Sequence, residues 1–204
     1  LLSESANQGN ADAQFRLGLY YHYELGVKKN IPVAPIAIEL WRKSAIQGNA
    51  GAQFALGLCY HEGKRVERNI GKAAELWTES ANQGHVFALY RLGICFNKGE
   101  GVEKNIPRAI ELWTKSAKTG NPGARFSLGD CYFKGEGVEK NISKAIELWE
   151  LSANQGHRDA QYKLGFCYYR GQGVEKNISR AIELWTKSAN QGNADAQFRL
   201  GDCY

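Results

Sequence analysis

The stretch that decides the fold is Ala37–Tyr60, which reads AIELWRKSAIQGNAGAQFALGLCY. Ala181–Tyr204 reads AIELWTKSANQGNADAQFRLGDCY, which is identical at 19 of the 24 positions and begins 144 residues, or four times 36, further along the chain. Tryptophan recurs every 36 residues, at Trp41, Trp77, Trp113, Trp149 and Trp185. A fixed period of this length is the signature of stacked structural repeats. The sequence therefore predicts a repeat protein.

The composition is that of an ordered chain, with 43% hydrophobic and 11% aromatic residues among 204. Because each repeat is stabilised by packing on its neighbours, we expect one elongated repeat domain over residues 1–204. Its repeats run approximately over 10–48, 49–84, 85–120, 121–156 and 157–192, with partial repeats at 1–9 and 193–204. The chain begins and ends within a repeat, so we interpret it as a fragment of a longer array.

Each repeat contains two helical patterns, which we call helix A and helix B. Helix A is expected to follow a capping residue, since Asn is a good N-cap; the caps are Asn10, Asn49, His85, Asn121, His157 and Asn193. It should end near a Gly-x-Gly such as Gly99-Glu100-Gly101, where glycine takes the left-handed conformation. Helix B is expected after Asn69, Asn105, Asn141 and Asn177. This predicts an all-α fold with ten or eleven helices.

Three details refine this pattern. The first repeat carries three extra residues, Val33-Ala34-Pro35, which we expect to lengthen its A–B loop. Helix A contains a glycine in every repeat, and because a mid-helix glycine costs about 1 kcal/mol, we expect the Trp to pack against its bare backbone. One cysteine per repeat excludes a partner within the repeat, so we expect buried free thiols at Cys59, Cys95, Cys131, Cys167 and Cys203.

The full pattern resembles the Sel-one-like repeat, a relative of the tetratricopeptide repeat. The motif consists of Ala-x-x-x-Leu-Gly-x-x-Tyr, then Gly-x-Gly-Val, Asn, Ala-x-x-x-Trp-x-x-x-Ala and Gln-Gly, and it covers the whole chain. The resemblance implies a right-handed α-solenoid whose A helices line the concave side. A disulfide-bridged branch of the family has two cysteines per repeat, and this chain, with one, does not match it.

Catalytic and cofactor chemistry is not indicated by the sequence. No Ser-x-x-Lys motif occurs, the cysteines lack the paired spacing of a zinc site, and the four histidines do not cluster. A metal pair at His22 and His61 is the one alternative, against ordinary surface histidines. We therefore predict no enzyme activity, no cofactor and no metal.

Neither nucleic acid nor a membrane span is indicated as a partner. The net charge of +5 is spread along the repeats rather than gathered in a basic stripe. No apolar run approaches the roughly 18 residues of a membrane span. We expect a cytoplasmic protein; the alternative is the secretory pathway, because Asn141 and Asn177 stand in glycosylation sequons that we interpret as helix caps.

Two sets of positions on helix A are candidate binding residues. The first is an aromatic ladder, which either packs between A helices or presents ring faces to a peptide: Phe15, Phe54, Tyr90, Phe126, Tyr162 and Phe198. The second is a stripe that differs among repeats and is predicted to be exposed, with apolar residues flanked by basic ones: Arg16, Leu19, Tyr23, Leu58, Arg91, Ile94, Lys98, Lys163, Phe166 and Arg170. Such a surface suits an amphipathic or acidic peptide; surface drift is the alternative.

We therefore predict a protein-interaction scaffold that binds a peptide or partner domain on the concave face of the A helices. The alternative is a structural spacer or assembly segment of a larger, possibly enzymatic, protein. A contiguous apolar groove along the A helices would favour binding, and a uniformly polar face would favour the spacer.

Overall fold

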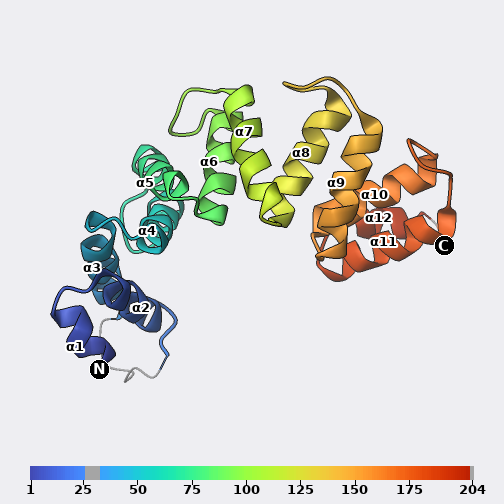
Figure 1. The fold of residues 1–204 in the computed structure, drawn as a ribbon. Helices are drawn as coiled ribbons and strands as arrows, with labels where there is room; N and C mark the ends of the chain where they lie inside the picture. The colour runs from blue at the N-terminus through green and yellow to red at the C-terminus, as the bar shows by residue number, and fades with distance from the viewer. Residues whose placement is uncertain (26–32, 203–204) are drawn as a thin grey trace. The chain divides into compact units, whose positions relative to one another are not determined.

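The computed structural model describes residues 1–25 and 33–202, and within these ranges the chain forms twelve helices and no strand (Figure 1). The helices are α1 (Leu2–Asn7), α2 (Ala11–His22), α3 (Val33–Ile46), α4 (Ala50–Glu62), α5 (Ile70–Asn82), α6 (Val86–Lys98), α7 (Ile106–Lys118), α8 (Pro122–Lys134), α9 (Ile142–Asn154), α10 (Arg158–Arg170), α11 (Ile178–Asn190) and α12 (Ala194–Gly201). Even-numbered helices are A helices and odd-numbered ones are B helices. The all-α prediction is confirmed, but the expected count was too low, because both partial repeats form helices.

The chain forms two compact units, Leu1–Asn105 with α1–α6 and Ile106–Tyr204 with α7–α12. We call them the N-terminal and C-terminal units. Within each unit, every helix packs against the next one in the chain, as α2 does on α3 and α8 on α9. The core of each unit therefore lies between consecutive helices.

The helix boundaries are set by the predicted caps. The side chains of Asn10, Asn49, His85, Asn121, His157 and Asn193 each accept a hydrogen bond from the third amide of the A helix that follows. Asn69, Asn141 and Asn177 cap B helices in the same way. Four A helices end at a glycine in the left-handed conformation, which an L side chain disfavours: Gly63, Gly99, Gly135 and Gly171.

The insertion of the first repeat lies elsewhere than expected. Val33, Ala34 and Pro35 form the first turn of α3 and not part of a loop. Proline is tolerated in a first turn because the amide it lacks has no partner there. Residues 26–32, which precede this turn, lie outside the described part of the chain.

The packing of tryptophan on glycine is confirmed in four repeats. A Cβ atom built at Gly57 would stand 2.5 Å from Nε1 of Trp77, and one built at Gly165 would stand 2.7 Å from Nε1 of Trp185. Gly18 with Trp41 and Gly129 with Trp149 repeat the arrangement. Each of these indoles also donates a hydrogen bond of 3.2–3.3 Å to a carbonyl of its A helix. Because glycine has no side chain, it leaves the space that the buried indole ring occupies.

Buried polar side chains join the helices in the same register. Four B-helix serines donate a 2.7–2.8 Å hydrogen bond to the first carbonyl of an A helix: Ser44, Ser80, Ser152 and Ser188. Gln53 donates to the carbonyl of Ala45, and Gln161 to that of Ala153, across the junction from one repeat to the next. The carbonyls of Ala45 and Ala153 also accept from the amides of Gly48 and Gly156, so the side chains satisfy their own donors at a second acceptor position and join the helices.

Candidate binding site on the A helices

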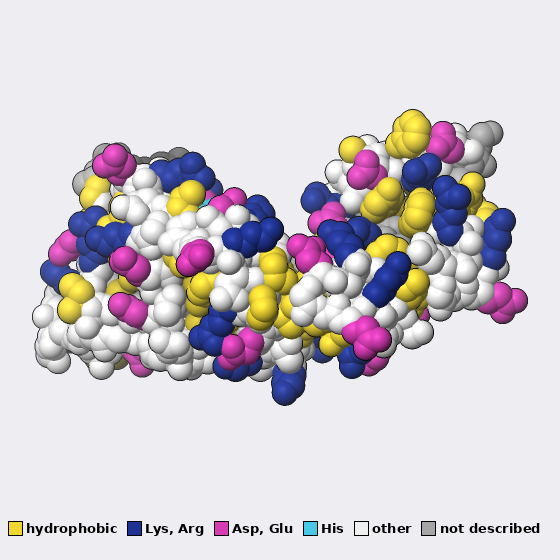
Figure 2. Space-filling view, turned by 90° about the horizontal axis from the view of Figure 1, so that it is seen from above, with side chains coloured by type: hydrophobic (Ala, Val, Ile, Leu, Met, Phe, Trp, Pro, Cys, Tyr) yellow, Lys and Arg dark blue, Asp and Glu magenta, His cyan; other side chains and the backbone are white. Residues whose placement is uncertain are grey.

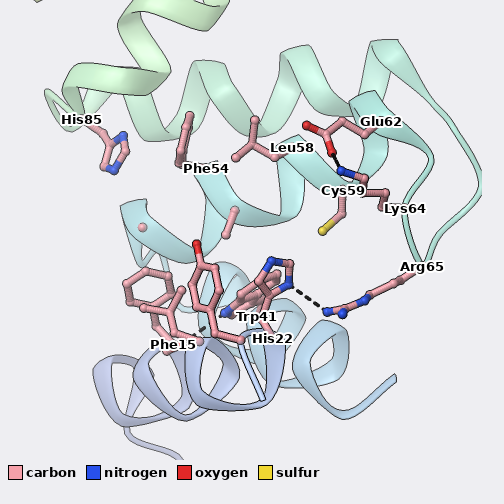
Figure 3. A pocket seen from close by; sticks show the side chains of 14 residues that line it. Phe15, His22, Trp41, Phe54, Leu58, Cys59, Glu62, Lys64, Arg65 and His85 are labelled. Carbon is pink, nitrogen blue, oxygen red and sulfur yellow. Dashed lines mark hydrogen bonds and ion pairs between the residues drawn. The ribbon is translucent and has the colours of Figure 1, made fainter. Parts of the chain in front are cut away.

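A pocket of about 610 Å³ opens on the A helices of the N-terminal unit (Figure 3). We call it the N-terminal pocket. It is lined by residues of α2, α3, α4, the loop after α4, and the cap of α6: Phe15, Leu19, His22, Tyr23, Trp41, Gly51, Phe54, Ala55, Leu58, Cys59, Glu62, Lys64, Arg65 and His85. Its volume lies within the range of small-ligand pockets, about 300–1,000 Å³.

One end of this pocket is aromatic. Figure 3 shows Phe15, Phe54 and His85 gathered there. The ring centroids of Phe54 and His85 lie 4.7 Å apart. Phe15 reaches in because α4 carries glycine opposite it: a Cβ at Gly51 would stand 2.7 Å from the phenyl ring. The rings thus form a preformed apolar wall.

The opposite end is charged. Nη1 of Arg65 donates to Nδ1 of His22 at 2.8 Å, and because a guanidinium only donates, the imidazole nitrogen is the acceptor. Glu62 is paired with Lys64 at 2.7 Å, and this hydrogen bond lowers the pKa of the Glu62 carboxyl. Burial, followed by the charges of Arg65 and Lys64, lowers the pKa of His22. His22 is therefore neutral at pH 7, and the charged end has a positive balance.

A second pocket, of about 310 Å³, occupies the same register in the C-terminal unit. We call it the C-terminal pocket; it is lined by Phe133, Trp149, Tyr162, Lys163, Phe166, Cys167 and Arg199. The guanidinium carbons of Arg170 and Arg199 lie 5.4 and 5.7 Å from the Phe166 ring centre. Lys163 lies 3.3 Å from Asp130 and 5.6 Å from the Trp149 ring. This pocket also combines aromatic walls with a cationic rim.

The structure brings half of the predicted stripe into these pockets. Leu19, Tyr23 and Leu58 line the N-terminal pocket, while Lys163 and Phe166 line the C-terminal one. Arg170 lies against Phe166. The remaining four stripe residues, Arg16, Arg91, Ile94 and Lys98, line neither pocket.

The predicted exposure of the apolar stripe was wrong. Leu19, Leu58, Ile94 and Phe166 are half-buried. In Phe166 the reason is clear, because its ring packs against the buried cluster around Trp185. Leu19, Leu58 and Phe166 therefore form the walls of pockets and not a flat seam, and basic side chains stand around them. On the face shown in Figure 2, hydrophobic side chains lie among Lys and Arg side chains.

The aromatic ladder has mixed surroundings. Phe15, Phe54, Tyr90, Phe126 and Tyr162 are half-buried, whereas Phe198 is 65% exposed. Phe126 stacks on the cap His157 at 4.8 Å, and Phe54 packs on His85 with a tilted ring. Phe15, Phe54 and Tyr162 also line pockets. A ring can thus pack on the next A helix and still face a pocket.

The histidines and cysteines have structural roles. His22 and His61 pack on Trp41 and Trp77 at 5.0 and 5.4 Å, so they are half-buried and not the surface histidines that were expected. In the described residues, no three His, Cys, Asp or Glu side chains gather in a way that could hold a metal. Cys59, Cys95, Cys131 and Cys167 are free and buried, and burial raises the pKa of the last three to about 11. Cys203 lies outside the described residues.

Sequence reasoning missed Arg65. The A–B loops of the next three repeats carry Gly-x-Gly, whereas this loop reads Gly63-Lys64-Arg65, so the broken pattern was the available signal. At the position of Ala55, which belongs to the variable face of helix A, the sister repeats carry Arg16, Arg91, Ser127, Lys163 and Arg199. This small residue leaves the N-terminal pocket open.

Comparison with known proteins identifies the class. A sequence model of the Sel1 repeat matches residues 11–49, 50–85, 86–121, 122–157, 158–193 and 194–204. The chain therefore belongs to the Sel1 repeat family, as the resemblance predicted. Comparison with curated proteins gave no match.

Solved structures with this fold include a protective antigen of uropathogenic Escherichia coli, which is 34% identical with a TM-score of 0.83 over 98% of this chain and 42% of that one. A Sel1 repeat protein from Oxalobacter formigenes is 33% identical with a TM-score of 0.85 over 93% of this chain and 74% of that one. An immunity protein from Pseudomonas aeruginosa is 25% identical with a TM-score of 0.58 over 91% of this chain and 67% of that one. This chain thus spans less than half the length of the E. coli antigen.

Proposed function

We propose that this chain is a protein-interaction scaffold that binds an extended peptide segment along its A helices, without enzymatic activity of its own. Sel1 repeat proteins are in general scaffolds for protein interactions. No helix in the described ranges is long and apolar enough to cross a membrane. The observation that carries the proposal is the N-terminal pocket, in which apolar walls and charged groups converge on positions that differ among repeats.

The contrast between constant and variable positions supports this assignment. Trp, its glycine and the Ser of helix B are the same in every repeat, and in four repeats they are shown to make the same buried contacts. The positions of Ala55 and Leu58 vary while the backbone around them stays the same. Packing alone therefore does not dictate the variable residues, and both of them line the pocket. Concave, mostly apolar sites with a few polar groups are the usual form of binding sites.

The experiment starts from peptides selected on the intact protein from a displayed library of random 12-residue sequences. Their affinities are then compared by fluorescence anisotropy for wild type and Ala55→Gln. Glutamine fills the pocket without disturbing the helix, because sister repeats carry Arg or Lys at this position. We expect at least a tenfold loss of affinity.

Glu111→Lys is the matched control. Glu111 lies on the outer surface of α7, where it pairs with Arg108 and Lys115, and it lines neither pocket. We expect this reversal to leave binding unchanged. If the selected peptides lose affinity through Glu111→Lys and not through Ala55→Gln, binding takes place on the B helices, and the proposed function is wrong.

A further inference from the structure

The backbone at Arg65 is unusual for an arginine. Its φ is 66°, in the left-handed region, and the residues at the same place in the next three A–B loops are Gly101, Gly137 and Gly173, with φ of 73°, 72° and 74°. A side chain is disfavoured there because its Cβ crowds the backbone. Residues held in such conformations gather at functional sites, where the surrounding structure offsets the strain.

The sister loops show that this is not a neutral replacement. A Cβ at Gly101 would stand 2.5 Å from the carbonyl oxygen of Ile70, and one at Gly137 would stand 2.5 Å from Cγ2 of Ile106. These loops pack so closely on the preceding B helix that a Cβ atom would force the isoleucine backbone or side chain to shift. The loop after α4 has the same backbone conformation yet admits an arginine, and its side chain reaches the N-terminal pocket.

The Arg65 guanidinium is held at the pocket by a neutral partner, so its positive charge is not compensated by a carboxylate of the described residues. Its observed partner is the neutral ring of His22, which accepts from Nη1 at 2.8 Å. The nearby carboxylate of Glu62 is already paired with Lys64 at 2.7 Å. Within residues 1–25 and 33–202, no carboxylate forms an ion pair with Arg65. A neutral acceptor thus orients a cation that stays available to an anion.

We propose that Arg65 recognises a carboxylate of the bound peptide, from an Asp or Glu side chain close to an aromatic or large aliphatic residue that inserts between Phe15 and Phe54. This inference rests on the proposed peptide-binding function. The two halves of the ligand correspond to the two ends of the pocket in Figure 3. A guanidinium binds a carboxylate through two parallel hydrogen bonds, which specifies geometry as well as charge. The positive balance of Arg65 and Lys64 against Glu62 favours an acidic segment over a basic one.

The test uses the selected 12-residue peptides and their acid-to-amide analogues. We expect acidic residues beside aromatic or aliphatic ones among them, and a tenfold or greater loss of affinity for wild type when Glu is changed to Gln. The affinity of the acidic peptide for Arg65→Gly should be about as low as that of the amide analogue for wild type. For Arg65→Gly, changing Glu to Gln in the peptide should then lower the affinity little further. Such coupling is the mark of a direct contact.

Arg65→Gly is suited to this purpose because glycine is the residue of the sister loops and takes the left-handed conformation without strain. Its unfolding midpoint should stay close to that of wild type. Lys43→Gln, which removes a positive charge from the exposed face of α3, is the charge-matched control and should leave affinity unchanged. His22 gives an independent readout: a carboxylate bound beside it favours its protonated form, so its pKa measured by NMR should rise with the acidic peptide and not with the amide analogue.

The outcomes separate the two proposals. If the Glu-to-Gln change lowers the affinity equally for wild type and Arg65→Gly, the carboxylate does not contact Arg65 and this inference is overturned. Sensitivity of binding to Ala55→Gln would still support the proposed function. If phosphoserine in place of Glu is needed for binding, the site takes a phosphate, and the assignment of a carboxylate is wrong. Peptides that are insensitive to Ala55→Gln as well would overturn both.

Discussion

Replacing Gly57 by alanine tests the packing that every repeat shares. Alanine is the better helix former by about 1 kcal/mol, so propensity alone predicts a more stable protein. The structure predicts the opposite, because the new Cβ would stand 2.5 Å from Nε1 and 2.7 Å from Cδ1 of Trp77. Comfortable contacts need about 3.5 Å, and Trp77, which is 1% exposed, has no free space into which to retreat.

The magnitude follows from three contributions. Overpacking of this kind costs about 1–3 kcal/mol, occasionally more. Movement of the indole also weakens its 3.3 Å hydrogen bond to the carbonyl of Phe54, a loss of about 1 kcal/mol. Against these stands the helix-propensity gain of about 1 kcal/mol. We therefore expect a net loss of about 1–3 kcal/mol, or roughly 2–12 °C in the unfolding midpoint of a chain of this size.

Differential scanning calorimetry of matched variants decides the question. Gly71→Ala is the control, since a Cβ there meets only the Asn69 side chain at 3.5 Å, and it should not destabilise. In a Trp77→Leu background the clash is gone, so Gly57→Ala should cost at least about 1 kcal/mol less than in wild type. If Gly57→Ala raised the midpoint in wild type, the reasoning would be refuted.

Three further predictions concern buried polar groups. Ser152→Ala should destabilise by about 0.5–1.5 kcal/mol, because the 2.8 Å hydrogen bond from α9 to the carbonyl of Pro122 is lost while that carbonyl keeps its helical amide partner; an unchanged denaturation midpoint would contradict this. Burial lowers the pKa of His85 and His157 below 6.5, so the folded state disfavours their protonation. The free energy of unfolding should therefore have its full value above pH 6.5 and decrease as the pH drops from there through their folded pKa values. Urea titrations should show this loss in wild type and a smaller one in His85→Asn/His157→Asn, which keeps an asparagine cap. The thiol of Cys167, whose pKa burial raises to about 11, should react with a thiol reagent at pH 8 only upon unfolding, whereas fast reaction of the native protein would show that the helices open.

The sequence predicted the features of this fold that repeat. Trp77 with Gly57, the Asn49 cap and the Gly99 helix end could each be inferred because local chemistry dictates them and several copies agree. The buried glutamines could not, since Gln53 looks like a surface residue until the carbonyl of Ala45 is seen beside it. Periodicity identifies the face of a helix but not the partner that faces it.

The same limit explains why the stripe was predicted in part. Helical projection placed Leu58 on the variable face correctly, but it could not show that the neighbouring A helix turns this face into a pocket wall. Whether a residue is exposed or half-buried depends on the next repeat. The pairing of Arg65 with His22 joins residues 43 positions apart, from a loop and a helix end, and no periodic pattern relates them.

Repetition itself distinguishes structural positions from functional ones in this chain. Where five copies keep one residue, the structure shows a contact that any change would disturb, such as the indole seated on glycine. Where one repeat carries a different residue that brings no structural advantage, packing does not explain why that residue is present. Arg65 departs against its own backbone preference, in a loop whose sisters carry glycine at this position, and its side chain lines the N-terminal pocket. Surface drift would favour residues that fit the left-handed backbone; an arginine there requires a compensating gain, and recognition of an anionic partner supplies one.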